Sequence, residues 1–515
     1  MGFLSRFARV PPPTATDFVE EDNGNAQRDS EKADVHDKEL ESTTHTHQRH
    51  VVPEIERRVV RKLDFRVVPL VTALYTLAFL DRSNIGNARI AGMTKDLRLV
   101  GNDYQWLLTI FYIAYIVFEW QALMWKIVPP HMWLAFTVLG WGIIATCQAT
   151  TQTWSGEMAL RFLLGIFEAG FGPGIPYLLS FFYLRHEVGV RIAVFLSAAP
   201  LATTFSGALA YGITSGHSHL ANWRLLFLVE GLPTICMAPV AYFFLPDTPD
   251  QARFLTEEEK VVAKARGVRQ VGGTKRVGGI VWKEVGMALL DLKCWFTAFM
   301  YFSCNVGFSS LPVFLPTILT DMGFNAIDSQ GLTAPPFFCS FLVTIFSTWV
   351  ADKTQQRGLT IMVLTTIGGI GYVLLATVKT VGVRYFGTFL AASGIFPSIA
   401  NILPWVTNNQ GSDTRRGAGI MLLNLIGQCG PLLGTNVFPT NEAPRYIKGM
   451  AISAAFTFFT GVLAFGLRCL LVYENRKLDQ KYGSNKDRVV NQPGARGVES
   501  EVGEENYGPT FRYVL

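Results

Sequence analysis

The chain has 515 residues, of which 49% are hydrophobic and 17% are charged, and its mean hydropathy is +0.26. Soluble domains carry nearer a quarter charged residues, and here long uncharged stretches run between about residues 65 and 473. This pattern predicts a membrane protein and excludes a row of soluble domains. The net charge of +5 is too small to indicate binding to nucleic acid.

Polar segments flank and divide the apolar part of the chain. Residues 1–64 lack apolar periodicity and predict a disordered cytoplasmic tail. Residues 246–293 predict a cytoplasmic central loop, and residues 474–515 predict a second cytoplasmic tail. Loosely spaced histidines in the first tail and scattered cysteines without a C-x-x-C pair indicate neither a metal site nor a disulfide framework. We expect no cofactor and no metal.

Twelve apolar segments are long enough to cross a bilayer, which takes roughly 20 helical residues. They form two halves of similar length, 65–245 and 294–473, around the polar centre. This repeat predicts an all-α membrane protein whose twelve transmembrane helices form two six-helix pseudo-symmetric bundles. The segments are 66–90, 104–126, 131–150, 158–183, 190–213, 223–245, 294–319, 332–351, 359–378, 383–406, 416–438 and 449–473.

Basic residues gather on one side of the expected membrane. The side that carries the central loop and both tails holds more arginine and lysine than the opposite side, so we expect both termini to be cytoplasmic. In the central loop, residues 256–259 (TEEE) form a capping box, and a short amphipathic helix follows to about Arg269. This helix is a latch or, more simply, a solvated surface helix. Asp352 and Arg357 fit a salt-bridge latch in a loop of the second half.

The first segment carries charges at membrane depth. Residues 65–80 are 16 residues, about 24 Å of helix, whereas the hydrocarbon core is about 30 Å thick. The helix must therefore continue through residues 81–87, which places Asp81 and Arg82 inside the bilayer, facing other helices or a wet cavity. The alternative is a helix that ends at Leu80, with both charges at the interface.

The fourth segment carries a second pair of charges. Arg161 and Glu168 are seven residues apart, so they share one helix face at about 10 Å difference in depth. A carboxylate at the depth of Glu168 must be paired or protonated. The functional interpretation is a proton or substrate pathway, and the structural one is a salt bridge that locks helices together.

The second half offers neutral polar side chains instead. This asymmetry predicts charge and proton handling in the first half and neutral hydrogen bonding in the second, although amides also join membrane helices by packing. The candidates are Tyr301, Asn305, Asn401, Trp405, Asn424 and Gln428. Enzyme motifs fail throughout, since no P-loop, dinucleotide loop or zinc-protease pattern is present. The chain is therefore not expected to be an enzyme or to use ATP.

Several motifs together make a specific resemblance. Residues 80–89 (LDRSNIGNAR) and 161–169 (RFLLGIFEA) resemble the first- and fourth-helix signatures of the anion:cation symporter branch of the major facilitator superfamily. Residues 222–231 (NWRLLFLVEG), 245–249 (LPDTP) and 254–259 (FLTEEE) resemble the fungal allantoate permease and nicotinate transporter subgroup. One departure is the loop at 125–131 (WKIVPPH), which lacks the aspartate of the superfamily's Gly-x-x-x-Asp pattern.

The resemblance implies a secondary active transporter that takes up a small organic anion with protons by alternating access. By resemblance, Asp81 and Glu168 carry protons, and Arg82 and Arg161 serve substrate binding and coupling. The substrate is then a carboxylate such as nicotinate, allantoate or pantothenate. The further substrate-binding candidates are Tyr115, Asn84, Tyr301, Asn305, Asn401, Trp405, Asn424 and Gln428.

Two alternatives stay open. The same fold can export a metabolite, and a non-transporting nutrient sensor is a less favoured reading because the tails are short. In the transporter hypothesis, protonation of the two acids releases the two arginines, which then bind a substrate carboxylate. We expect a monomer in the lipid bilayer, at the plasma membrane, whose partners are the organic anion and protons.

Overall fold

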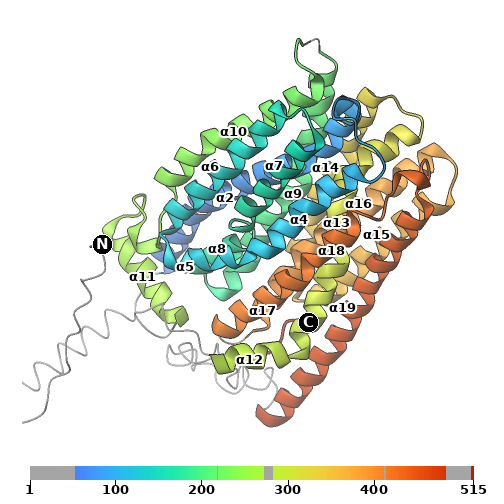
Figure 1. Ribbon diagram of the computed structural model, residues 1–515. Coiled ribbons are helices and arrows are strands. Elements are labelled where there is room, and N and C mark those ends of the chain that lie inside the picture. Colours follow the sequence, from blue (N-terminus) through green and yellow to red (C-terminus); the bar gives the residue numbers. More distant parts are fainter. Residues whose placement is uncertain (1–52, 217, 272–281, 411–412, 483–511) are drawn as a thin grey trace, which may run out of the picture. The chain divides into compact units, whose positions relative to one another are not determined.

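The computed structural model describes residues 53–216, 218–271, 282–410, 413–482 and 512–515, which are helical over most of their length (Figure 1). Residues 1–52 and 483–511 of the predicted tails (1–64 and 474–515), and residues 272–281 of the central loop, lie outside the described residues. The first half contains α2 (Pro53–Ala88), α3 (Thr94–Asp96), α4 (Asp103–Phe118), α5 (Met124–Ile127), α6 (Pro130–Cys147), α7 (Trp154–Ala169), α8 (Gly174–Phe182), α9 (Arg185–Thr214) and α10 (Asn222–Phe244). The centre contains α11 (Glu257–Val271) and α12 (Trp282–Leu290). The second half contains α13 (Leu292–Asp321), α14 (Ala326–Thr354), α15 (Arg357–Thr377), α16 (Val381–Asn408), α17 (Asp413–Gly427), α18 (Cys429–Gly434) and α19 (Ile447–Tyr482).

Among the described residues, eleven helices are long and apolar enough to cross a membrane. The twelfth expected crossing, 104–126, is helical but broken: α4 has 16 residues, and a 3-10 helix at Glu119–Leu123 separates it from α5. The segment is apolar enough to cross the membrane, but a count of apolar residues does not predict where the backbone of a helix is interrupted. With it, the chain has the predicted twelve-helix architecture.

The helices at the two ends of the apolar region extend beyond the predicted boundaries. α2 begins at Pro53 and has Glu54 and Glu56 in its first turn, which suits a helix N-terminus. Residues 53–64, predicted as part of a disordered tail, are therefore helical. α19 continues to Tyr482, so the predicted start of the second tail at residue 474 is also too early. In both cases the helix projects past its apolar part as a polar extension.

The first helix also decides between two predictions. α2 is continuous to Ala88, so the alternative in which it ends at Leu80 is wrong. Asp81 is 2% exposed and lies inside the helical bundle. The helix then passes into a π-helical turn at Arg89–Met93, where Gly92 has a φ of 112° that only glycine adopts readily.

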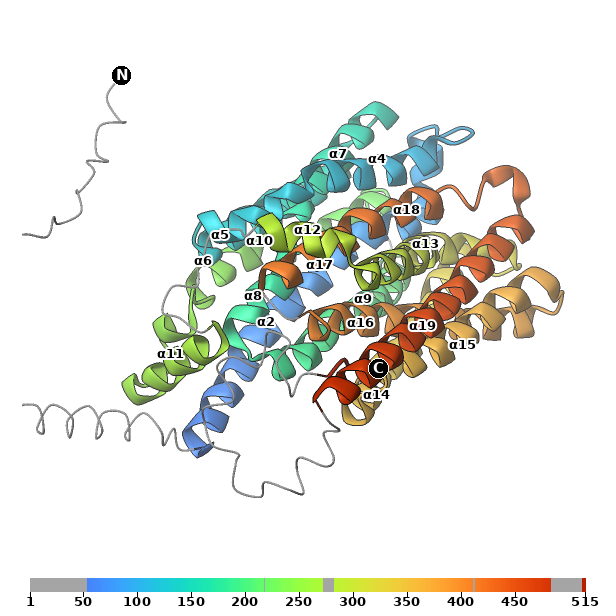
Figure 2. The same ribbon diagram turned by 90° about the horizontal axis from the view of Figure 1, so that it is seen from below.

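The helices gather as two groups, with α2 to α10 in blue to green and α13 to α19 in yellow to red (Figures 1 and 2). We call the end at which α2 begins and α11 packs the linker end, and the opposite end the distal end. At the distal end the halves are joined directly. Gln105 Nε2 donates to Phe438 O (3.3 Å), and Gln330 Nε2 donates to Asn87 O (3.4 Å). Thr214 Oγ1 donates to Gln330 Oε1 (2.6 Å).

At the linker end, α11 is fastened to the first half. The predicted capping box is present, with Thr256 N donating to Glu259 Oε2 (2.9 Å) and Glu259 N donating to Thr256 Oγ1 (3.4 Å). Arg266 is 4% exposed and forms ion pairs with Glu56 of α2 and Glu187 of α9. The simpler prediction of a solvated helix is therefore wrong for this face, because these ion pairs make α11 a latch between α2 and α9.

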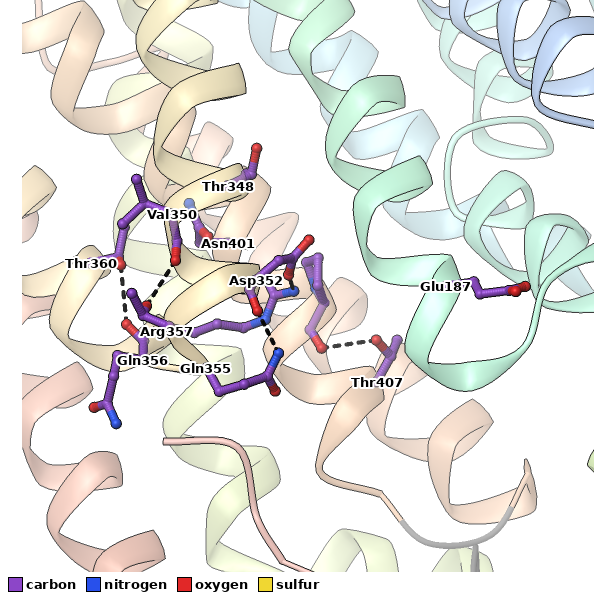
Figure 3. A network of polar contacts seen from close by, with 12 residues as sticks. Glu187, Thr348, Val350, Asp352, Gln355, Gln356, Arg357, Thr360, Asn401 and Thr407 are labelled. Atoms are coloured by element: carbon purple, nitrogen blue, oxygen red, sulfur yellow. Dashed lines mark hydrogen bonds and ion pairs between the residues drawn. The ribbon is translucent and has the colours of Figure 1, made fainter. Parts of the chain in front are cut away.

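The predicted latch in the second half is also present. Asp352 and Arg357 form an ion pair across the turn that joins α14 to α15, and their side chains point toward each other in Figure 3. Gln355 Nε2 donates to Asp352 O (2.6 Å) in the same turn. In the first half, where the loop at 125–131 lacks the motif's aspartate, Asp247 accepts from His131 N (3.1 Å) at the start of α6.

The close approach of α2 and α13 at the distal end predicts the effect of a larger side chain at Gly86. A Cβ atom there would lie 2.7 Å from Val313 O, so Gly86→Val must separate the helices. We expect this variant to lose about 1–3 kcal/mol of folding stability. We also expect a longer distance between spin labels placed at the exposed residues Val100 and Ile327. Gly212→Val is the control, because a Cβ at Gly212 meets nothing within 4 Å. An unchanged distance in Gly86→Val would contradict the close packing of α2 against α13 at the distal end.

Candidate functional site

A cavity lies between the two halves, with an empty volume of ≈ 580 Å³ when open solvent is included. Both halves contribute to its wall, which contains aromatic rings, amides, prolines and one guanidinium group. The lining residues are Tyr75, Arg82, Tyr112, Tyr115, Gly172, Pro173, Pro176, Phe195, Leu196, Tyr301, Asn305, Phe308, Leu403, Asn424, Gln428 and Pro431.

The charged group of this cavity is Arg82 of α2. Its Nη2 and Nε donate to the same oxygen of Glu168 on α7, Oε2, at 2.6 and 3.1 Å. The side chain of Glu168 is 1% exposed and that of Arg82 is 14% exposed. Arg82 therefore lines the cavity, and Glu168 is buried behind it. The first and fourth apolar segments, which carry the charges at membrane depth, meet here.

Aromatic rings hold the guanidinium group in place. The Arg82 Cζ lies 4.9 Å from the ring centroid of Phe111 and 5.2 Å from that of Tyr115. Both residues belong to α4, and contacts of this kind favour a cation over the ring face. Gly172 allows this arrangement, because a Cβ there would collide with the Tyr115 hydroxyl. Tyr115, one of the sequence candidates, thus lines the cavity beside Arg82.

The second half closes the cavity with neutral groups. The candidates Tyr301, Asn305, Asn424 and Gln428 all line it. Asn305 Nδ2 donates to Gly427 O (3.0 Å), which ties α13 to the last residue of α17. The break between α17 and α18 falls at Gln428, so this amide lies where the helix is interrupted. The predicted division between charges in the first half and amides in the second describes this cavity.

Other candidates lie outside the lining. Arg161 is 1% exposed and pairs with Glu157 on its own helix, with Nε and Oε1 at 3.6 Å. Its Nη1 donates to Arg82 O (3.4 Å). Arg161 thus supports the backbone of α2 and does not share the carboxylate of Glu168. The signal for this pairing was present in the sequence, since Glu157 is four residues before Arg161.

Asp81 points away from Arg82, although the two are adjacent in sequence. Its Oδ2 accepts from Thr234 Oγ1 of α10 (2.9 Å). Glu230, one turn earlier on α10, is 2% exposed and accepts from Ser206 Oγ (3.3 Å). Asp81 and Glu230 belong to a polar layer between α2, α9 and α10. Sequence reasoning noticed Glu230 but gave it no role.

Three further candidates are corrected by their placement. Asn84 is 1% exposed, and its amide forms no hydrogen bond within the described part of the chain. Asn401 Nδ2 donates to Pro397 O (2.9 Å) in its own helix. Trp405 Nε1 donates to Val514 O (2.8 Å). None of the three lines the cavity, because helix periodicity identifies polar positions but not the neighbour that each one faces.

Two lining tyrosines were missed. Tyr75 is seven residues before Arg82 on α2, and Tyr112 is three residues before Tyr115 on α4, so each shares a helix face with a predicted residue. That spacing could have identified both. They complete an aromatic wall around the guanidinium group.

A family model described as Major Facilitator Superfamily matches residues 71–435. The chain belongs to this superfamily. Similar curated proteins include the MFS transporter prlL of a fungal species (strain NRRL 50135), which is 35% identical over 84% of this chain and 89% of its own length. The high-affinity nicotinic acid transporter of Saccharomyces cerevisiae is 33% identical over 79% of this chain and 76% of its own length. These relatives agree with the predicted fungal nicotinate and allantoate subgroup.

Solved structures show the same fold. The proton:xylose symporter XylE bound to 6-bromo-6-deoxy-D-glucose matches with a TM-score of 0.59 at 13% identity, over 78% of this chain and 95% of that one. An inward-facing, unoccupied bacterial homologue of the human lysosomal transporter Spinster matches with a TM-score of 0.58 at 16% identity, over 78% and 96%. The chain is a multi-pass membrane transporter of small molecules and not an enzyme.

The buried ion pair predicts an asymmetric response to mutation. Arg82→Leu leaves Glu168 without its partner and should cost about 3–5 kcal/mol of stability. The double variant Arg82→Leu/Glu168→Leu should recover most of this loss, because no buried charge is left unpaired. Thermal unfolding of the purified protein in one detergent measures both.

The control is Lys260→Ala on α11, whose partner Glu257 has a side chain that is 88% exposed. That change should cost less than about 1 kcal/mol. If the double variant is no more stable than Arg82→Leu, the cavity does not depend on this pair as described.

Proposed function

We propose that this transporter takes up a small organic anion together with protons. The observation that carries the proposal is the placement of Arg82, which lines the cavity while its guanidinium group is held by a buried carboxylate. A planar guanidinium group matches a carboxylate, so a competing anion can replace Glu168. A sugar fits this cavity less well, because the cation favours an anion.

The other lining residues suit a flat molecule of limited size. Tyr75, Tyr112, Tyr115 and Tyr301 offer ring faces and hydroxyl groups, and Asn424 and Gln428 offer neutral donors and acceptors. Nicotinate, allantoate and pantothenate are within this class. Nicotinate is favoured as the first compound to test, because a relative 33% identical to this chain is called a high-affinity nicotinic acid transporter.

Coupling follows from a competition for Arg82. While Glu168 is ionised, its Oε2 accepts both hydrogen bonds from Arg82. A proton that binds Glu168 removes the negative charge, and Arg82 is then free to bind the substrate carboxylate. Once the substrate carboxylate binds, Arg82 is paired again, whereas protonation of Glu168 alone leaves it unpaired. The loaded cavity therefore costs less to close away from water than the protonated, empty one. Release of the proton restores the pair and displaces the substrate.

The remaining acids and Arg161 have secondary roles in this scheme. Asp81 and Glu230 form a second proton-binding layer next to the cavity, bonded to Thr234 and Ser206. Arg161 positions α2 through Arg82 O rather than binding substrate. This revises the sequence-based scheme, in which both arginines bound the substrate. We place the protein in the plasma membrane as a monomer, without a cofactor and with the linker end cytoplasmic.

Export of a metabolite is the second candidate, because the cavity is compatible with either direction. An uptake screen of radiolabelled carboxylates at two external pH values tests the proposal. Faster uptake of one of them at the lower external pH supports proton-coupled import. If no carboxylate enters, but preloaded vesicles release a carboxylate into a medium that contains it at higher concentration, the exporter is favoured instead.

Glu168→Gln is the sharpest test of coupling. The neutral amide cannot exchange a proton, so we expect uptake driven by a pH gradient to fall by at least about tenfold, while exchange of substrate across the membrane is retained. Radiolabelled nicotinate in proteoliposomes, with and without a pH gradient, measures both. Glu258→Gln, at an exposed position on α11, is the control. Proton-driven uptake that is unchanged in Glu168→Gln would remove Glu168 from the mechanism.

A further inference from the structure

A short segment far along the chain lies on the linker end of the second half. Residues Arg512–Leu515 follow a stretch outside the described residues, form no regular secondary structure and lie beside α16. Val514 O accepts from Trp405 Nε1 (2.8 Å) and from Asn409 Nδ2 (3.0 Å). Val514 N donates to Asn409 Oδ1 (2.8 Å). The amide of Asn409 thus satisfies both backbone groups of a single residue.

A second asparagine repeats this pattern one residue earlier. Tyr513 N donates to Asn475 Oδ1 (2.8 Å), and Asn475 Nδ2 donates to Tyr513 O (2.9 Å). Asn475 belongs to the part of α19 that was expected to be a tail. Arg512 Nε donates to Asp479 Oδ1 on the same helix (2.7 Å). Asn475 of α19 and Asn409, which directly follows α16, therefore bind the backbone of adjacent residues, as the walls of a peptide-binding groove do.

Further contacts connect the segment to α15 and α13. Leu515 O accepts from Gly358 N (3.2 Å), next to the latch residue Arg357. The Lys293 Nζ lies 5.1 Å from the ring centroid of Tyr513. The segment therefore touches four helices of the second half, α13, α15, α16 and α19, at one end of the bundle.

The same helix ends face the first half. A Cβ atom on Gly189 of α9 would lie 3.1 Å from Arg357 Nη2 and 3.7 Å from Pro404 Cβ. Pro404 immediately precedes Trp405, and α16 contains a second internal proline, Pro397. Each proline removes a backbone hydrogen bond and permits a helix to bend. The part of α16 that can bend thus contacts both the other half and the segment.

We propose that residues Arg512–Leu515 form an intramolecular clasp, bound in a peptide groove, that restrains the linker end of α16 and opposes its movement relative to α9. The groove consists of Asn409, Trp405, Asn475, Asp479 and Gly358, and none of these lines the substrate cavity. The clasp acts on the helix ends and not on the substrate, so the inference does not depend on which compound is transported.

The test compares the full chain with a variant that lacks residues 512–515, both in lipid nanodiscs. We expect backbone amide exchange at residues 401–409 and 357–360 to rise at least about tenfold in the shortened chain, because several hydrogen bonds are lost. A synthetic peptide Arg-Tyr-Val-Leu should restore slow exchange, and a scrambled peptide should not. Spin labels at the exposed residues Val261 and Thr354 should report a broader distance distribution in the shortened chain.

A second variant tests the proposal in the full chain, in case the shortened chain folds poorly. Asn409→Asp/Asn475→Asp keeps the size of both side chains but turns a carboxylate oxygen toward Val514 O and Tyr513 O, so it should release the clasp in the full chain. Lys477→Ala, exposed on the same helix, should change nothing. Exchange and distances that match the unaltered protein in both clasp variants would overturn the proposal. Faster exchange that the peptide fails to reverse would overturn it as well.

Discussion

The ion pair between Arg82 and Glu168 is the constraint on which the cavity depends. A charge at this depth of a membrane protein needs a partner, and each of these residues has one only because α2 continues past Leu80 and α7 passes beside it. Both guanidinium bonds converge on one oxygen, Oε2. The wall of the cavity therefore contains a cation, Arg82, whose charge is neutralised by the buried carboxylate of Glu168. In the proposed mechanism, a proton or an anion can change this pairing without moving any backbone.

The two ends of the bundle are built on different principles. At the distal end the halves bond to each other directly, through Gln330 to Asn87 and through Gln105 to Phe438. At the linker end, the ion pair Asp352–Arg357 fastens α14 to α15 within the second half. The ion pair Arg266–Glu56 fastens the central helix α11 to α2 of the first half. Direct bonds between halves must break when that end opens, whereas bonds within a half move with it. The linker end is thus internally braced, and the distal end is held shut.

Sequence reasoning identified the architecture and the buried charges for physical reasons, and it failed elsewhere for equally physical ones. Apolar length fixes the crossings, and the cost of a buried charge singles out four residues, Asp81, Arg82, Arg161 and Glu168, of which Arg82 and Glu168 form the ion pair at the cavity. Neither argument identifies a partner across helices. Asp81 bonds Thr234 and Trp405 bonds Val514, contacts that depend on helix rotation and on chain segments distant in sequence. A 3-10 break at Glu119 leaves no trace in composition. Two residues of the groove for Arg512–Leu515, Asn475 and Asp479, lie in a stretch that looks like a polar tail in the sequence.

The charged groups of the cavity belong to the first half and its amides belong to the second half, which affects how the two halves can be joined. The cation and its internal acid both belong to the first half, on α2 and α7, so their pairing can change while the halves stay in place. The amides of Asn424 and Gln428 belong to the second half and line the same cavity. A carboxylate bound to Arg82 that also reaches these amides would bridge the halves, whereas Glu168 bound to Arg82 does not. Under the proposed function, substrate binding would then favour a closed arrangement that the internal ion pair alone does not stabilise. This difference in contacts is what a ligand needs in order to shift a conformational equilibrium.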